Sequence, residues 1–170
     1  MKTIARSDLY LPMAAMILTA ALADPAAAQT SCAGGCFKGT FQGQDAHDIL
    51  PPGATSVVIH TTASGTGTHL GQFSLIREIT GNLVNFSDTG SAQWIAANRD
   101  SIYTTIVGQA ELSDLPGGFL KVTETHTITG GTGRFTGAQG SFTVERLASG
   151  VTFLTAGSFH GSITAPSAAH

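Results

Sequence analysis

The chain of 170 residues is 42% hydrophobic and only 11% charged, with 21 glycines, whereas an average protein has about 25% charged residues and about 7% glycine. This composition is typical of a β-rich chain with many turns. Lys and Arg together number 8, Asp and Glu number 11, and the net charge of −3 provides no basic field for a phosphate backbone. The charge therefore argues against nucleic-acid binding, and the length suits one domain with a real core.

The N-terminal segment has the pattern of a secretory signal peptide. Lys2 and Arg6 precede the apolar stretch from Leu9 to Leu22, and Ala26 to Ala28 form a small-residue cleavage site. The apolar stretch is shorter than the roughly 20 residues that a membrane-spanning helix needs. We therefore predict a signal peptide over residues 1–28, a single β-barrel domain over 29–170, and a periplasmic or secreted protein.

Both cysteines of the chain, Cys32 and Cys36, follow the predicted cleavage site. Thiols of exported proteins are normally oxidised, so we expect a local disulfide between them. A bridge that closes so short a loop constrains little of the unfolded chain, and it would fasten the terminus rather than hold the core.

The rest of the chain shows period-two alternation of Val, Ile, Phe and Thr, broken by turn residues at roughly even intervals. No helix is predicted. The expected strands are Cys36 to Gln44, Thr55 to Ala63, His69 to Thr80, Ser91 to Ala97, Ser101 to Leu112, Phe119 to Thr129, Ser141 to Leu147 and Val151 to Thr164. The expected turns include Ser64 to Gly67 and Gly130 to Gly140, and Leu83 to Phe86 is either a ninth short strand or an extension of the third.

Eight sequential antiparallel strands can close into an up-and-down barrel, which removes exposed edges and leaves an interior able to hold one small ligand. We therefore predict an all-β fold, an eight-stranded antiparallel up-and-down barrel. A β-sandwich is the alternative. An outer-membrane barrel would need aromatic girdles, and the chain has one Trp and two Tyr, so a membrane-embedded barrel is disfavoured.

Four segments between Gly65 and Thr164 carry a family resemblance: GTGTHLGQF, WIAANRDSIYTTIVGQ, VTETHTITGGTGRFTGAQGSFTVER and GSFHGSIT. The most specific piece runs from Ile128 to Phe135, with Gly137 and Gly140 after it. This stretch resembles the bacterial exported relatives of the allene oxide cyclase and dirigent barrels. The resemblance implies a calycin-like barrel with an apolar central cavity, often in a homo-oligomer, and chemistry on small hydrophobic molecules. No catalytic residue is carried over from it.

The glycine-rich segment is also interpretable on physical grounds alone. Its glycines would supply the positive φ angles of a long turn, Phe135 would plug the end of the barrel, and Arg134 would point to solvent or hold a neighbouring loop. A phosphate-binding loop is disfavoured because a strand follows where a helix would have to begin.

Several ionisable residues share a strand face with apolar residues. In the strand expected from Phe119 to Thr129, side chains alternate between two faces. Glu124 and His126 share the more apolar face with Leu120, Val122 and Ile128. Arg77 shares the face of Phe73, Leu75 and Ile79, with His69 in phase. Arg146 follows Phe142 and Val144. If these faces point inward, the interior carries a charged cluster, and buried charges must pair or bind something.

Two interpretations of this cluster stay open, and a third possibility is that the faces are reversed. The cluster is a structural ion pair in a filled barrel, or it orients a ligand in an apolar pocket. In the second case Glu124 and His126 are the candidate catalytic residues, because burial and charged neighbours tune their pKa values. Arg77, Arg146, His69 and Tyr103 are then candidate ligand contacts. The His spacing matches no metal motif, so neither a metal nor another cofactor is expected.

The sequence thus favours a secreted barrel that acts on a small hydrophobic or aromatic molecule as a cyclase, isomerase or lyase. A non-catalytic binding or dirigent-like barrel is the close alternative, and an envelope protein with a filled core is the third.

Overall fold

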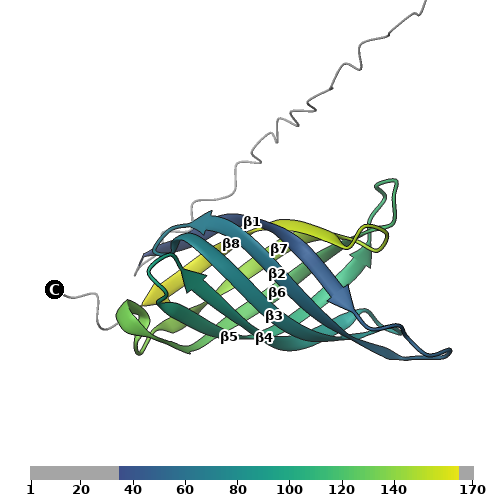
Figure 1. The fold of residues 1–170 in the computed structure, drawn as a ribbon, viewed down its shortest axis with the longest axis horizontal. Coiled ribbons are helices and arrows are strands. Elements are labelled where there is room, and N and C mark those ends of the chain that lie inside the picture. Colours follow the sequence, from purple (N-terminus) through teal and green to yellow (C-terminus); the bar gives the residue numbers. More distant parts are fainter. Residues whose placement is uncertain (1–34, 165–170) are drawn as a thin grey trace, which may run out of the picture. The chain divides into compact units, whose positions relative to one another are not determined.

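The computed structural model describes residues 35–164, which form one closed barrel of eight antiparallel strands in sequence order. Each strand pairs with its neighbours in the chain, and β1 closes the barrel on β8 (Figure 1). The predicted up-and-down barrel is therefore confirmed. The strands are β1 (Cys36–His47), β2 (Ser56–Gly67), β3 (Gly71–Asn82), β4 (Ser87–Ala96), β5 (Ser101–Leu112), β6 (Phe119–Gly131), β7 (Gln139–Ser149) and β8 (Leu154–Thr164).

The predicted signal peptide and Cys32 lie outside the described residues. Both the signal peptide and the disulfide to Cys36 at the start of β1 stay predictions. Within residues 35–164, no helix has the length and apolar character needed to cross a membrane.

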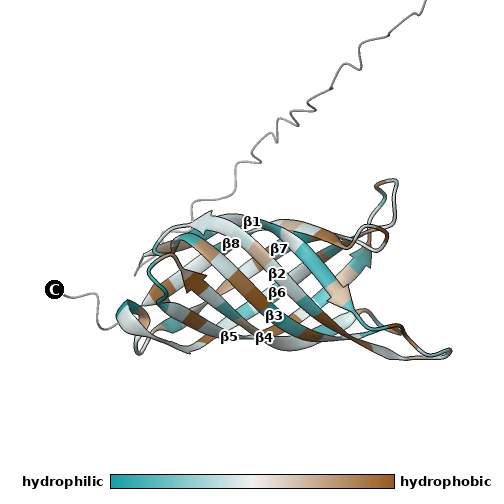
Figure 2. Ribbon diagram, viewed as in Figure 1, coloured by the Kyte–Doolittle hydropathy of each residue, from teal (hydrophilic) through white to brown (hydrophobic). Residues whose placement is uncertain are grey.

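Side chains alternate between the interior and the outer surface along every strand, as the period-two pattern predicts. On β3, for example, Phe73, Leu75, Arg77 and Ile79 are buried, while the residues between them are exposed. Hydrophobic and hydrophilic segments accordingly alternate along the ribbons in Figure 2. The more apolar face of each strand therefore points into the barrel, together with the charged residues on it.

One predicted turn and one predicted strand segment are wrong. Ser64 to Gly67 continues β2, and the hairpin turn lies at Thr68 to Leu70. Leu83 to Phe86 is the turn between β3 and β4, because the side-chain oxygen of Asn82 accepts hydrogen bonds from the backbone N–H groups of Val84 and Asn85. A side chain that binds its own turn in this way competes with strand pairing.

The two ends of the barrel differ. The connections β1–β2, β3–β4, β5–β6 and β7–β8 gather at one end, on the right in Figure 1, which we call the mouth. The connections β2–β3, β4–β5 and β6–β7 gather at the other, which we call the closed end. Near the closed end the interior is filled by an aromatic cluster of Phe37, Phe41, Phe73, Trp94, Phe142 and Phe159, whose ring centroids lie 4.9–6.2 Å apart in contacting pairs.

The glycine-rich segment seals the closed end. After β6 the chain forms one short 3-10 helix, η1 (Gly133–Phe135), and Phe135 is 3% exposed within the core, as the plug interpretation predicts. Arg134 lies over the Phe135 ring at 4.9 Å and approaches a carboxylate oxygen of Asp100 in the β4–β5 connection at 3.9 Å. Arg134 therefore holds a neighbouring loop against the plug.

Candidate functional site

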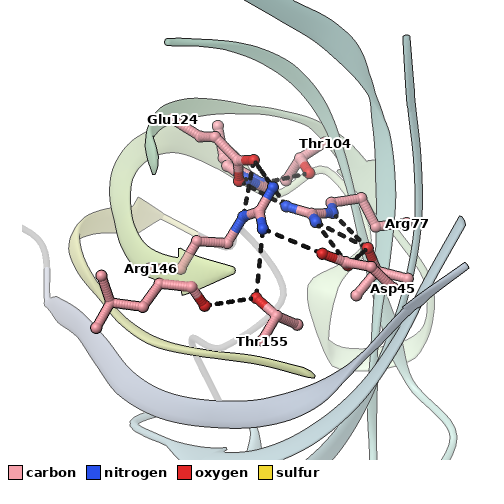
Figure 3. A network of polar contacts seen from close by, with 9 residues as sticks. Asp45, Arg77, Thr104, Glu124, Arg146 and Thr155 are labelled. Atoms are coloured by element: carbon pink, nitrogen blue, oxygen red, sulfur yellow. Dashed lines mark hydrogen bonds and ion pairs between the residues drawn. The ribbon is translucent and has the colours of Figure 1, made fainter. Parts of the chain in front are cut away.

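The structure brings together four of the residues that the sequence singled out. Arg77 comes from β3, Glu124 and His126 from β6, and Arg146 from β7, and all four side chains are buried. They lie between the aromatic cluster and the mouth, and they form the centre of a hydrogen-bonded network (Figure 3). The inward orientation of the three strand faces is thus confirmed.

Glu124 is the central anion of this network. Its carboxylate accepts two hydrogen bonds from Nη1 of Arg77, at 2.7 and 2.9 Å, and one from Nε of Arg146 at 3.1 Å. Nε2 of His126 lies 3.3 Å from Oε2 of this carboxylate, and Nδ1 of His126 lies 3.0 Å from the hydroxyl of Thr104. A neutral ring protonated on Nε2 satisfies both contacts, donating to Glu124 and accepting from Thr104.

A second anion, Asp45 of β1, balances the second arginine. Its carboxylate lies 3.4 Å from Nη2 of Arg77 and 3.4 Å from Nη1 of Arg146. The hydroxyl of Thr61 donates to Asp45 at 2.5 Å and accepts from Arg77, and Thr155 accepts from Arg146 at 3.3 Å. The predicted first strand ends at Gln44, one residue too early to include Asp45, although Asp45 is in phase with Phe37 and Phe41.

The network shifts the pKa values of its members. Burial alone would raise the pKa of Glu124, but the Arg77 guanidinium, the His126 hydrogen bond and the charge of Arg146 together hold it well below its ordinary range. Burial lowers the pKa of His126, against the opposing effect of Glu124, and this keeps the ring neutral near pH 7. Burial and the neighbouring Arg146 also lower the pKa of Arg77.

A cavity of about 200 Å³ lies between the network and the mouth. Its wall is mostly apolar, and Asp45, Asp88 and Arg146 are its buried charged lining residues. The rest of the lining includes His47, Leu50, Val57, Ile59, Ile79, Gly81, Asn82, Leu83, Phe86, Ser87, Ala110, Leu120, Val122, Ala148, Ser149, Gly150 and Phe153. Glu124, His126 and Arg77 do not line this cavity.

Asp88 is, after Asp45, the second site residue that the sequence interpretation missed. It is 5% exposed, and its Oδ1 is buried without a hydrogen-bond partner among the described residues. Burial, reinforced by the negative charge of Glu124, raises the pKa of Asp88 to about 6. The predicted fourth strand begins only at Ser91, so Asp88 was not placed on a strand face, although it is in phase with Ala92 and Trp94.

Two predicted ligand contacts lie elsewhere. His69 is exposed in the β2–β3 turn at the closed end, where its φ of 64° ends the alternation of the strands. Tyr103 points outward from β5 and is 39% exposed. The phase of Tyr103 with its neighbours is that of the outer face, and the register shift between β5 and β6 follows directly after it. Neither side chain reaches the cavity.

Among residues 35–164, no group of three His, Cys, Asp or Glu side chains is arranged to hold a metal ion. In comparisons with protein-family models, with curated proteins and with solved structures, no match to this chain was found. The resemblance to the allene oxide cyclase and dirigent barrels therefore stays a prediction, and the site has to be interpreted from its own geometry.

Proposed function

We propose that the protein binds one small, mainly apolar molecule in the mouth cavity, with the polar end of that molecule directed toward Asp88 and Arg146. The observation that carries the proposal is the cavity itself, since about 200 Å³ of mostly apolar space lies directly above buried charged groups. A cavity of about 150 Å³ in another protein suffices for benzene. An apolar pocket with a few convergent polar groups is the usual form of a small-molecule site.

The mouth supports an apolar ligand. Leu50, Leu83, Phe86 and Phe153 line the cavity and are each 37–40% exposed. Exposed apolar side chains gathered at a concave site are unfavourable in water unless something covers them. A ligand that enters between these side chains would bury them together with its own apolar surface.

A catalytic role in isomerisation or elimination is the second candidate function. It is supported by Asp88, which lines the cavity and whose pKa of about 6 suits a group that takes up and releases a proton near neutral pH. In that case the proton-transfer group is Asp88. Glu124 and His126, which the sequence favoured, lie behind the cavity floor and position the two arginines.

The binding proposal is tested with toluene, a small apolar probe, by calorimetric or NMR titration of the purified protein. The variant Ala110→Phe places a ring inside the cavity, whereas Val107→Phe adds the same ring to the outer face of the same strand, where Val107 is 65% exposed. We expect toluene to bind the wild type and Val107→Phe, and not Ala110→Phe. Equal binding by all three proteins, or no binding by the wild type, would contradict the proposal.

A further inference from the structure

The buried charges of the barrel interior do not sum to zero. Asp45 and Glu124 are matched by Arg77 and Arg146 through the ion pairs described above, with N to O distances of 2.7–3.4 Å. His126 is neutral. Among the buried residues that the structure describes, Asp88 is therefore the charged group without an ion-pair partner, and it lines the cavity.

The residues that flank Asp88 on the two neighbouring strands are both glycines. Asp88 pairs with Gly81 of β3 and with Gly108 of β5, so no side chain flanks it on either neighbouring strand. A Cβ atom at position 108 would lie 2.3 Å from Oδ1 of Asp88. Glycine thus permits the Asp88 side chain to lie across β5 toward Glu124, and a larger residue at position 108 would require Asp88 or Glu124 to shift.

We propose that the mouth cavity takes a small apolar amine, whose ammonium group is held by the carboxylate of Asp88. This inference rests on the proposed function and names its ligand class. A cation at this point supplies the missing positive charge beside the Asp88 carboxylate, while the apolar wall accepts the rest of the molecule. A carboxylate ligand would instead place another anion beside Asp88, and Arg146, the arginine that lines the cavity, is already paired with Asp45 and Glu124.

The proposal predicts how affinity depends on pH. The ionisable groups around Asp88 are Asp45 and His47 of β1, Arg77 of β3, Glu124 and His126 of β6, and Arg146 of β7. The pKa values of Glu124 and His126 are both lowered, so Glu124 stays ionised and His126 neutral near pH 7, whereas the pKa of Asp88 is raised to about 6. If Asp88 must be ionised to bind an ammonium group, then affinity rises as pH increases through about 6.

The experiment uses four probes of one size: benzylamine, benzyl alcohol, benzoate and toluene. Each is titrated by calorimetry against the wild type, Asp88→Asn, Asp114→Asn and His47→Gln between pH 5 and pH 7.5. Asp114→Asn makes the same charge change at an exposed residue of the β5–β6 connection that does not line the cavity. His47→Gln replaces the histidine that lines the cavity.

We expect the wild type to bind benzylamine most tightly, about tenfold more tightly at pH 7 than at pH 5. Asp88→Asn should lose at least tenfold of that affinity and most of its pH dependence while it still binds toluene. Asp114→Asn should behave like the wild type, and His47→Gln should keep the rise of benzylamine affinity with pH. Thermal unfolding of each variant checks that it is folded.

Three outcomes would overturn the proposal. The first is tighter binding of benzoate than of benzylamine, and the second is unchanged benzylamine affinity in Asp88→Asn. In both of these cases the cavity remains a binding site and only the ligand class is wrong. The third is the absence of binding by any of the four probes, toluene included, and it would remove the proposed function as well.

Discussion

Two carboxyl groups of the same interior, Glu124 and Asp88, have opposite pKa shifts, and their hydrogen-bond partners explain the difference. Glu124 accepts from two arginines and lies against His126, so its charged form is favoured despite complete burial. Asp88 is also desolvated but lacks such donors, and it lies near the negative charge of Glu124. Burial disfavours the charged form of both carboxyl groups, but only Glu124 has hydrogen-bond and ion-pair partners that outweigh the effect of burial.

The first prediction concerns Asp88→Asn and stability. The pKa of Asp88 is raised from 3.8 to about 6, so ionising it costs stability, and this cost appears as pH rises through that range. This pKa shift limits the cost of ionising Asp88 to at most about 3 kcal/mol of unfolding free energy at pH 7, and screening by solvent makes the cost smaller. We expect Asp88→Asn to raise the free energy of unfolding by roughly 1–2 kcal/mol at pH 7, with the gain shrinking toward zero below pH 4.

Urea unfolding followed by the fluorescence of Trp94, the one tryptophan of the chain, measures this difference at each pH. Asp114→Asn serves again as the exposed control and should show no such pH-dependent gain. A variant that is less stable than the wild type at pH 7 would contradict the prediction.

The second prediction concerns Glu124→Gln. The lowered pKa of Glu124 means that its contribution to stability is fully present above about pH 4.5 and is lost as pH falls toward its folded pKa. Removing the charge leaves two buried guanidinium groups with half of their anionic partners. We expect a loss of about 3–5 kcal/mol at pH 7, with a smaller loss in strong acid.

Chemical unfolding against pH checks this expectation, with Glu145→Gln as a matched change on the outer face of β7. A loss under about 1 kcal/mol at pH 7 would mean that the ion pairs of Glu124 contribute little to the stability of the fold.

At the scale of the strand, small inward residues decide where large side chains fit. A Cβ atom at Gly108 would lie 2.3 Å from Oδ1 of Asp88 and 2.7 Å from Cγ of Glu124, whereas one at Gly81 would meet only Val57 at 3.4 Å. These two glycines flank the same residue, so they form a matched pair. The third prediction is that Gly108→Ala lowers the free energy of unfolding by about 1–3 kcal/mol through overpacking, while Gly81→Ala changes it by under about 1 kcal/mol.

Denaturant titration of both variants makes the comparison, and benzylamine titration adds a second readout. Gly108→Ala should also weaken benzylamine binding, because the methyl group displaces the Asp88 carboxylate. Equal stability of the two alanine variants would show that β5 can shift to accommodate the methyl group.

The mouth loops hold two phenylalanines in a strained backbone conformation. Phe86 and Phe153 line the cavity with φ of 60° and 58°, a left-handed region that bulky residues rarely adopt. In each loop the Phe N–H donates to a carbonyl four residues earlier, and the Phe carbonyl accepts from an adjacent strand. The loops are thus built alike, and each of these hydrogen bonds fixes a ring at the cavity wall.

The fourth prediction follows from that strain. Glycine relieves the left-handed conformation, which costs a residue with a Cβ atom about 1–2 kcal/mol, whereas alanine removes the ring and keeps the cost. We expect Phe86→Gly to be more stable than Phe86→Ala, the reverse of the usual order in extended backbone, and both variants to release toluene faster than the wild type. Thermal unfolding and NMR exchange rates measure the two effects, and a more stable Phe86→Ala would show that the backbone relaxes out of this region.

Much of the barrel, and part of the site, could be predicted from the sequence. Period-two alternation placed Arg77, Glu124, His126 and Arg146 on inward faces, because the period of a strand is fixed by its geometry. Asp45 and Asp88 were missed because both lie within three residues of a strand end at the mouth, beyond the predicted strand bounds. The prediction at Ser64 to Gly67 failed because Gly65 and Gly67 face inward, where they leave room for the rings of Phe73 and Phe159.

At the scale of the whole barrel, three zones follow one another from the closed end to the mouth: an aromatic cluster, a charged network and a cavity. His126 joins the first two, because its ring stacks on Phe142 at 5.0 Å and lies edge-on to Trp94 at 5.6 Å while its nitrogens contact Thr104 and Glu124. Arg146 joins the second and third, since it binds Glu124 and lines the cavity. Stability and binding are thus concentrated in different zones of one barrel.

The fifth prediction tests that separation with Phe159→Ala. Phe159 is 1% exposed, contacts four other rings of the aromatic cluster, and does not line the cavity. Its truncation leaves a void in the closed end, and we expect a loss of about 3–5 kcal/mol in the free energy of unfolding. Benzylamine affinity measured well below the lowered melting temperature should stay within a factor of about two, because additivity holds for separated sites.

Asp88→Asn is the reciprocal variant, since it should change affinity strongly without loss of stability. A Phe159→Ala protein that loses affinity in proportion to stability would indicate that the aromatic cluster sets the position of the charged network through His126. In that case the barrel responds as one cooperative unit, and the ligand at the mouth would in turn stabilise the closed end.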